Sequence, residues 1–192
     1  MFCGITGEKK CRCGKETDKI SAMEVDLPST MRKLWTDHGV YTKFVLNSIV
    51  DGTSDVEQLL PRLMANQTDI GEQLKYVVGD EAGENLTRVL KEHIRLAGEV
   101  MKAAITGDSQ LVAVAVDVLF ANSRDVAIVI SSFNPEKLPM VFVLAMFDEH
   151  NQFVIDMTVA RIRGEFKREI ELYDAYYNEL LEMSDMIVAG LS

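Results

Sequence analysis

The sequence of 192 residues has little that would build a disulfide-bonded, secreted or membrane-spanning protein. Its 3 cysteines all lie within the first 13 residues, and an odd count with no partners elsewhere argues against a disulfide framework. The longest uninterrupted apolar run, residues 140–147, is far too short to cross a bilayer. The N-terminus also lacks the apolar segment of a secretory signal. We therefore expect a soluble, intracellular protein.

Basic residues are also scarce, because 20 bases face 30 acids and leave a net charge of −10. Nucleic acids and anionic membranes both attract a basic surface, so we expect neither as a partner. Proline is rare as well, with 4 residues, and 47% of the chain is hydrophobic. This composition predicts one globular domain with room for a sizeable core.

Motifs of known catalytic and cofactor sites are missing. No Glu-x-x-His occurs, which excludes the ferritin-like di-iron signature, and there is neither H-E-x-x-H nor C-x-x-C-H. A glycine-rich phosphate loop with its lysine and a Ser/His/Asp arrangement are absent too. The sequence therefore gives no reaction directly, and an enzyme is not the leading expectation.

The cysteines lie in a segment rich in lysine and glycine, at Cys3, Cys11 and Cys13. The C-x-C-G element offers part of a zinc site, but a tetrahedral site needs a fourth ligand that this segment does not provide. We expect a free N-terminal tail over residues 1–27, with a metal-binding or intermolecular role as the alternative. The folded domain is then expected over residues 28–192.

A threefold internal repeat is the most informative feature present. Histidine, glycine and asparagine recur about 56 residues apart, and the sets are His38, Gly52 and Asn66, then His93, Gly107 and Asn122, then His150, Gly164 and Asn178. The distance from histidine to glycine is 14 residues in every copy, and from glycine to asparagine it is 14, 15 and 14. These three histidines are the only ones in the chain.

Each repeat is predicted to be a helical hairpin that turns at its glycine, because both flanks carry helix-period patterning. The expected helices cover about residues 28–50, 55–78, 81–105 and 109–130, then a fifth from near residues 135–139 and a sixth over 165–188. Residues 126–130 are rich in valine and isoleucine, which leaves a strand as an alternative there. The predicted fold is all-α, an up-down antiparallel bundle of three pseudo-repeated hairpins.

The histidines lie on the apolar stripes of their helices, so the sequence predicts a buried polar layer. Residues equally far from a hairpin turn lie side by side, which should bring each histidine to its asparagine. An aspartate follows two of the asparagines at i+3, and Asp174 lies one turn before the third. We predict His38, His93, His150, Asp69, Asp125 and Asp174 as metal ligands, and Asn66, Asn122, Asn178 and Tyr41 as further binding residues.

Two interpretations of this layer remain open. Imidazoles and carboxylates could bind a divalent metal such as zinc or iron, or a small ligand, with the asparagines orienting the ligands. Alternatively, each histidine bonds within its own hairpin and the layer only fixes helix register. The second interpretation fits a structural or assembly protein with protein partners, for instance a viral particle component. A metal-dependent hydrolase or oxidoreductase is a third candidate.

Three short segments resemble motifs of an uncharacterised family of small bacterial and large-DNA-virus proteins. Residues 34–43, LWTDHGVYTK, resemble its opening motif L-W-x-E-H-x-x-W-T-R, and residues 66–71, NQTDIG, resemble N-Q-x-D-I-G. Residues 81–87 resemble a later E-A-G-x-x-L-T element. Asp37, Tyr41 and Lys43 depart mildly from the pattern. The resemblance covers the chain from about residue 33 onward and implies a helical bundle, without a reaction.

Overall fold

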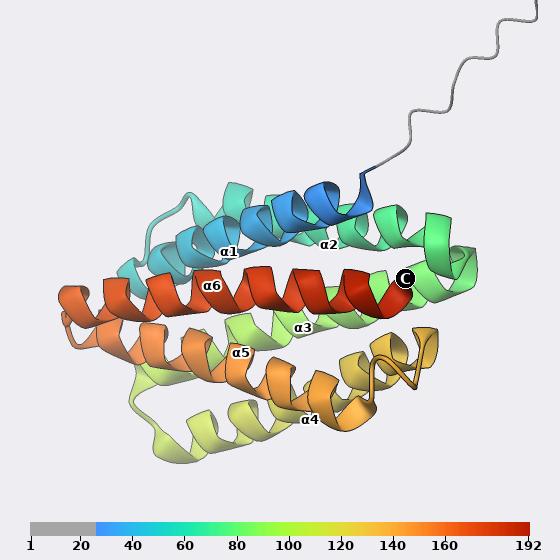
Figure 1. Ribbon diagram of the computed structural model, residues 1–192. Coiled ribbons are helices and arrows are strands. Elements are labelled where there is room, and N and C mark those ends of the chain that lie inside the picture. The colour runs from blue at the N-terminus through green and yellow to red at the C-terminus, as the bar shows by residue number, and fades with distance from the viewer. Residues whose placement is uncertain (1–25) are drawn as a thin grey trace, which may run out of the picture.

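The computed structural model describes residues 26–192, and over that range the chain is all-helical (Figure 1). The helices are α1 (Leu27–Asp51), α2 (Val56–Val78), α3 (Asp80–Thr106), α4 (Ser109–Phe133), α5 (Met140–Ile162) and α6 (Phe166–Leu191). The predicted all-α bundle of six helices is confirmed. The expected tail with its three cysteines lies outside the described residues, apart from Asp26 and Leu27, which cap and begin α1.

Glycines turn the three hairpins as the repeat predicts. Gly52, Gly107 and Gly164 have φ values of 69°, 72° and 70°, a left-handed backbone that glycine adopts without steric cost. Asp108, directly after the second of these glycines, caps α4 by accepting hydrogen bonds from the backbone N–H groups of the first helical turn. The alternative of a strand over residues 126–130 is wrong, because these residues lie inside α4.

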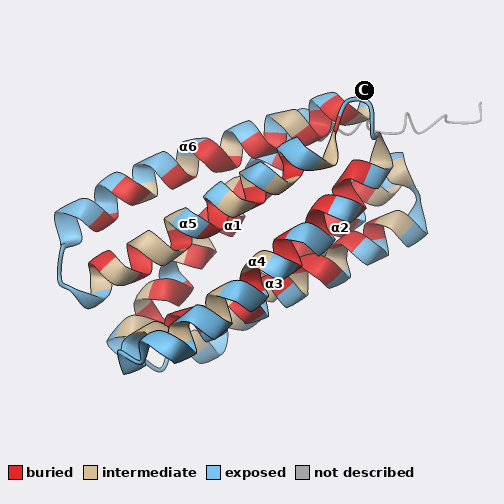
Figure 2. Cartoon of the chain, turned by 90° about the horizontal axis from the view of Figure 1, so that it is seen from below, coloured by how far each residue is buried: buried red, intermediate tan, exposed pale blue. Residues whose placement is uncertain are grey.

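The six helices form a closed antiparallel ring. Consecutive helices pack against each other, α6 packs back against α1, and the odd-numbered helices α1, α3 and α5 also contact one another. The three odd helices are therefore the inner ones, and α2, α4 and α6 lie on the outside. Figure 2 shows buried and exposed residues alternating around the helices, as expected of amphipathic helices that share a core.

One main apolar core runs through the bundle, and Trp35, Phe147 and Tyr176 are among its largest fully buried side chains. The connection between α2 and α3 is tighter than the hairpin turns, since Gly79 alone separates the helices. A Cβ atom added at Gly71 would lie 2.7 Å from the carbonyl oxygen of Gly83. Both glycines therefore permit a close approach of the two helix backbones. Within residues 26–192, no helix has the length and apolar character needed to cross a membrane.

Candidate functional site

The three histidines meet in the interior of the bundle, one from each inner helix. His38, His93 and His150 are 2%, 3% and 2% exposed. His150 is central, because its ring centroid lies 5.6 Å from that of His38 and 5.9 Å from that of His93. The predicted convergence of the histidines at one depth of the bundle is therefore what the structure has.

Each histidine contacts a polar side chain 29 residues later, on the outer helix of its own hairpin. In the first hairpin, the amide nitrogen of Gln67 donates to Nδ1 of His38 at 3.1 Å. The same amide nitrogen lies 3.0 Å from the backbone oxygen of Leu63 and 3.0 Å from Oδ1 of Asn66. Asn66 in turn donates to the backbone oxygen of Leu34, one turn before His38, at 3.0 Å. His38 is therefore an acceptor at Nδ1 and carries its proton on Nε2.

In the second hairpin, a single asparagine bonds both the histidine and a backbone oxygen, whereas the first hairpin uses Asn66 and Gln67 for these two contacts. The Nδ1 of His93 donates to Oδ1 of Asn122 at 2.8 Å. Nδ2 of the same asparagine donates to the backbone oxygen of Val89 at 3.4 Å. Because Val89 precedes His93 by four residues, as Leu34 precedes His38, the two hairpins tie the same backbone position to the outer helix.

In the third hairpin, a carboxylate replaces the amide. Nδ1 of His150 lies 3.2 Å from Oε2 of Glu179, which is 8% exposed. Asn178, the residue that the repeat pattern selected, is exposed on the outside of α6. The ring of Tyr176, one turn before Glu179, packs on His150 with centroids 5.0 Å apart.

Further polar side chains complete the layer. Nδ2 of Asn151, which follows His150, donates to the hydroxyl of Ser123 on α4 at 2.7 Å. Both of these side chains are fully buried, at 1% and 0% exposed. This hydrogen bond joins the second and third hairpins, whereas each histidine bonds within its own.

Burial keeps His38 and His93 neutral near neutral pH. Desolvation, helped by the neighbouring His150, lowers the pKa of His93 from its ordinary value of 6.5 to about 4. Desolvation is also the main cause that holds the pKa of His38 well below 6.5, and His150 and His93 add to it. Burial raises the pKa of the Tyr176 phenol well above its usual range. These groups act as neutral hydrogen-bonding side chains and not as charges.

The predicted aspartates do not join the layer. Asp69, Asp125 and Asp174 are all exposed, so the expectation that they converge with the histidines is wrong, and it is wrong for Asn178 too. A residue at i+3 is rotated by about 60° from the first around a helix. That rotation carries Asp69 and Asp125 from the buried edge of each outer helix to the solvent.

Tyr41 is half-buried and lies apart from the contacts of the layer. The guanidinium of Arg62 stacks over its ring, 4.6 Å from the centroid. Asp174 and Asn178 instead share a shallow surface cavity of about 430 Å³ with Tyr173 and Tyr177 on the outer face of α6.

The pattern analysis missed Gln67, Glu179 and Asn151. The signal for the first two was present in the chain, because a spacing of 29 residues from each histidine selects Gln67, Asn122 and Glu179 together. The repeat instead pairs each histidine with an asparagine 28, 29 or 28 residues later, and this pairing conceals the constant spacing of 29. Nothing in the repeat pattern marks Asn151, whose partner lies in another hairpin.

Several polar atoms of this region have no hydrogen-bond partner among the described residues. They include Nε2 of His38, Oε1 of Gln67, Oε1 of Glu179, the indole nitrogen of Trp35 and the hydroxyl of Tyr176. Within residues 26–192, no three His, Cys, Asp or Glu side chains are grouped so that they could hold a metal ion. The five cavities described on this part of the chain include none of the three histidines in their lining.

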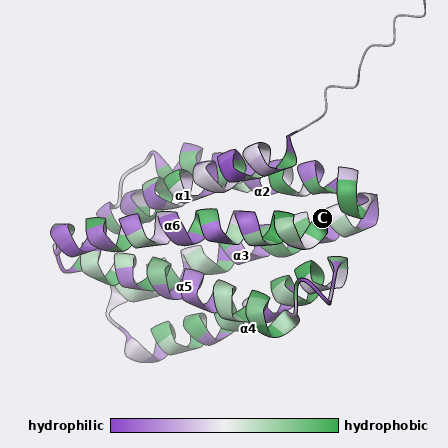
Figure 3. Ribbon diagram, in the orientation of Figure 1, coloured by the Kyte–Doolittle hydropathy of each residue, from purple (hydrophilic) through white to green (hydrophobic). Residues whose placement is uncertain are grey.

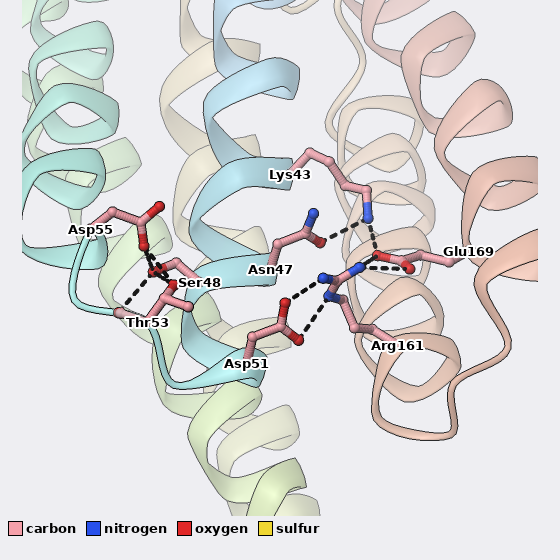
Figure 4. Close-up of polar contacts among 8 residues, drawn as sticks. All are labelled: Lys43, Asn47, Ser48, Asp51, Thr53, Asp55, Arg161 and Glu169. Carbon is pink, nitrogen blue, oxygen red and sulfur yellow. Dashed lines mark hydrogen bonds and ion pairs between the residues drawn. The ribbon is translucent and has the colours of Figure 1, made fainter.

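A second polar cluster lies near the turn end of the hairpins, where α1, α5 and α6 come together (Figure 4). Glu169 of α6 is 2% exposed and forms ion pairs with Lys43 of α1 and Arg161 of α5. Arg161 also binds both carboxylate oxygens of Asp51. All of these charges are paired, so the cluster is a clamp between the first and third hairpins. Burial lowers the pKa of Lys43.

Residues of the three family-like motifs contact one another in the fold. The first and second motifs are joined by the bonds of Gln67 to His38 and of Asn66 to Leu34. A Cβ atom at Gly71 of the second motif would lie 1.9 Å from the hydroxyl of Thr87 in the third. These motif positions therefore serve the packing of α1, α2 and α3.

The chain was compared with protein-family models, with curated proteins and with solved structures, and none of them matches it. The resemblance to the bacterial and viral family stays a prediction.

Proposed function

We propose that this chain is a non-catalytic structural or assembly protein in which the histidine layer fixes the register of the three hairpins. The observation that carries the proposal is the hydrogen bond between each histidine and a side chain 29 residues later in its own hairpin, at 3.1, 2.8 and 3.2 Å. A viral particle component would be one protein of this kind.

Hydrogen bonds suit this role because apolar contacts alone leave similar helices free to slip. Sliding one helix by a turn moves it about 5.4 Å, which would break every histidine contact of that hairpin. A buried donor or acceptor left without a partner costs about 1–3 kcal/mol. One polar pair in each hairpin therefore penalises a shifted register three times over, much as a single buried polar residue selects the register of a coiled coil.

A second candidate is the binding of a divalent ion such as zinc or iron. The unpartnered Nε2 of His38 and Oε1 of Glu179 favour it, since both are buried and both atoms are metal ligands in other proteins. His150 lies between these two side chains and would be the third ligand. Their present placement does not group them for an ion, so binding would require their side chains to turn. The proton of His38 would also have to move from Nε2 to Nδ1, which would break the hydrogen bond that Gln67 donates. A small organic ligand or an enzyme substrate would need a cavity at the layer.

Replacing Glu179 by Gln separates the two candidates, because it exchanges the carboxylate of the third hairpin for a neutral amide of nearly the same size. The structural proposal expects Glu179→Gln to unfold with a free energy within about 1 kcal/mol of the wild type, since the amide oxygen still accepts from His150. It also expects less than one zinc or iron ion per chain in both proteins, purified without a histidine tag and reconstituted with each metal.

One tightly held ion per wild-type chain that is lost in Glu179→Gln would contradict the structural proposal and support the ion site. Glu182→Gln is the matched control, because Glu182 is an exposed acid of the same helix. This control should leave both the metal content and the unfolding free energy at their wild-type values.

A further inference from the structure

The outer face of α4 carries an exposed apolar stripe along most of its length. Leu111, Val114, Val118 and Ile128 are 47%, 57%, 46% and 50% exposed. Ala121, between the last two, is exposed as well. Figure 3 shows α4 predominantly green, which marks its hydrophobic character. The stripe faces away from the helix's packed side, where Leu119, Asn122 and Val126 are buried in the bundle.

The other two outer helices, α2 and α6, have a different exposed surface, although each is also the second helix of its hairpin. The exposed faces of α2 and α6 carry acids, including Glu57, Asp69 and Glu72 on α2 and Glu171, Asp174, Glu182 and Asp185 on α6. Among the 25 residues of α4, only Asp117, Arg124 and Asp125 are charged. On a chain of net charge −10, this is the outer helix where another acidic molecule meets the least repulsion. Contiguous exposed apolar surface of this kind marks an interaction site.

The spacing of the stripe is that of a coiled-coil seam. Once Asp125 is counted with the five apolar residues, the positions follow one another at intervals of three, four, three, four and three residues, namely Leu111, Val114, Val118, Ala121, Asp125 and Ile128. An average of 3.5 residues per turn keeps a stripe facing one partner helix as two helices wind around each other. The covering partner is therefore expected to be a helix with a matching stripe.

Two charged residues beside the stripe indicate which helix covers it and in which direction that helix runs. Asp117 and Arg124 lie seven residues apart on the same side of the stripe, and both are exposed. Neither forms an ion pair within residues 26–192. If a second α4 packs antiparallel, Asp117 of each copy faces Arg124 of the other, which gives two ion pairs related by the twofold axis. A parallel pair would instead bring like charges to the same height.

We propose that two copies of this chain associate through α4, with the two helices antiparallel. In this arrangement Leu111 lies opposite Ile128 of the second copy, and Val118 lies opposite Ala121. Asp125 lies opposite Val114 and is the one charged member of the seam. A polar residue in such a seam fixes the register at a cost in stability. This dimer uses a surface of the molecule remote from the histidine layer, so either proposal can fail alone.

Sedimentation velocity over a concentration series tests the dimer, with a reductant present so that Cys3, Cys11 and Cys13 cannot cross-link copies. The wild type should shift from monomer to dimer as its concentration rises. Val118→Glu puts two charges at the centre of the seam and should raise the dissociation constant at least roughly tenfold. The matched control is Ile170→Glu on α6, where an apolar side chain of 59% exposure is replaced away from the seam, and it should leave the dissociation constant unchanged.

A charge swap tests the antiparallel direction. Asp117→Arg places arginine opposite Arg124 in both ion pairs of the seam, so it should weaken the dimer. Adding Arg124→Asp to the same chain exchanges the two charges and should restore the wild-type dissociation constant. Arg124 lies near the carboxylate of Asp148, so thermal unfolding of each variant checks that the fold is kept.

Three results would overturn the proposal. The first is a wild type that stays monomeric over the whole series, including the case in which it binds only a different protein. The second is a dimer that Val118→Glu does not weaken. The third is a dimer that Asp117→Arg weakens and the double exchange fails to restore.

Discussion

The second and third hairpins bury a histidine in the same layer and satisfy it with different chemistry. In the second, Nδ1 of His93 donates to the neutral amide of Asn122, whose nitrogen also binds a backbone oxygen. In the third, Nδ1 of His150 meets the carboxylate of Glu179, and Oε1 of that carboxylate has no partner among the described residues. Both the oxygen and the nitrogen of the Asn122 amide form hydrogen bonds, whereas only one oxygen of the Glu179 carboxylate does.

The difference teaches that the repeat preserves a position and not a chemical group. The first hairpin makes the same point, because there an amide nitrogen donates and the imidazole of His38 accepts. An amide donor, an amide acceptor and a carboxylate all satisfy a buried imidazole at the same 29-residue spacing. This tolerance is expected if the layer fixes register, since any polar partner at the correct height will do so.

Acid should break the neutral pairs first, and this is the largest effect we expect. The pKa of His93 is about 4 in the folded chain and near its ordinary 6.5 in the unfolded chain. The unfolded state therefore binds the proton more readily, and stability falls as the pH is lowered from 6.5 towards 4. His93 alone contributes about 3 kcal/mol to this loss. Urea unfolding at a series of pH values measures it.

The comparison protein for this series is His93→Gln, which keeps a donor for Asn122 and removes the titration. Between pH 6.5 and 5 its unfolding free energy should fall less steeply than that of the wild type. Equal slopes for the two proteins would show that His93 takes up its proton as readily in the folded chain as in the unfolded one.

Removing the amide from the second hairpin should have the next largest effect. Asn122→Ala leaves the buried Nδ1–H of His93 without its partner, so we expect a loss of about 2 kcal/mol of unfolding free energy. The backbone oxygen of Val89 loses only a second hydrogen bond, because it lies inside α3. Asn178→Ala removes the asparagine that holds the matching repeat position in the third hairpin. Because Asn178 is exposed, this change should stay within about 0.5 kcal/mol. Similar losses in both variants would contradict the assignment of the layer.

The fold could be predicted from local signals because each one has a local cause. The glycines at 52, 107 and 164 are needed for a left-handed turn, and the structure has all three there. The apolar stripes with helical period place the histidines inside. The sequence predicts the end of α4 at Ile130, whereas the helix ends at Phe133. It continues for three more residues because nothing breaks the helix before Asn134.

The partners of the histidines were harder to predict, because they depend on how two helices are rotated against each other. Asn66 and Gln67 are neighbours in the chain and are both buried, so the pattern alone did not identify which one reaches His38. Glu179 follows an asparagine and belongs to an acid-rich helix, where a charged residue ordinarily faces water. Its burial is set by the contact of α6 with α5, which no local pattern reports.

The smallest expected change in stability belongs to the variant that tests the central claim most directly. His93→Leu combined with Asn122→Leu replaces one whole pair by apolar side chains of similar size, so no polar group of the pair remains buried without a partner. The unfolding free energy should then equal or exceed that of the wild type. The measurement is the amide NMR spectrum of this double variant. If the layer fixes register, helix content is kept while the signals of α3 and α4 broaden or multiply; one sharp, well-dispersed set like that of the wild type would contradict the account.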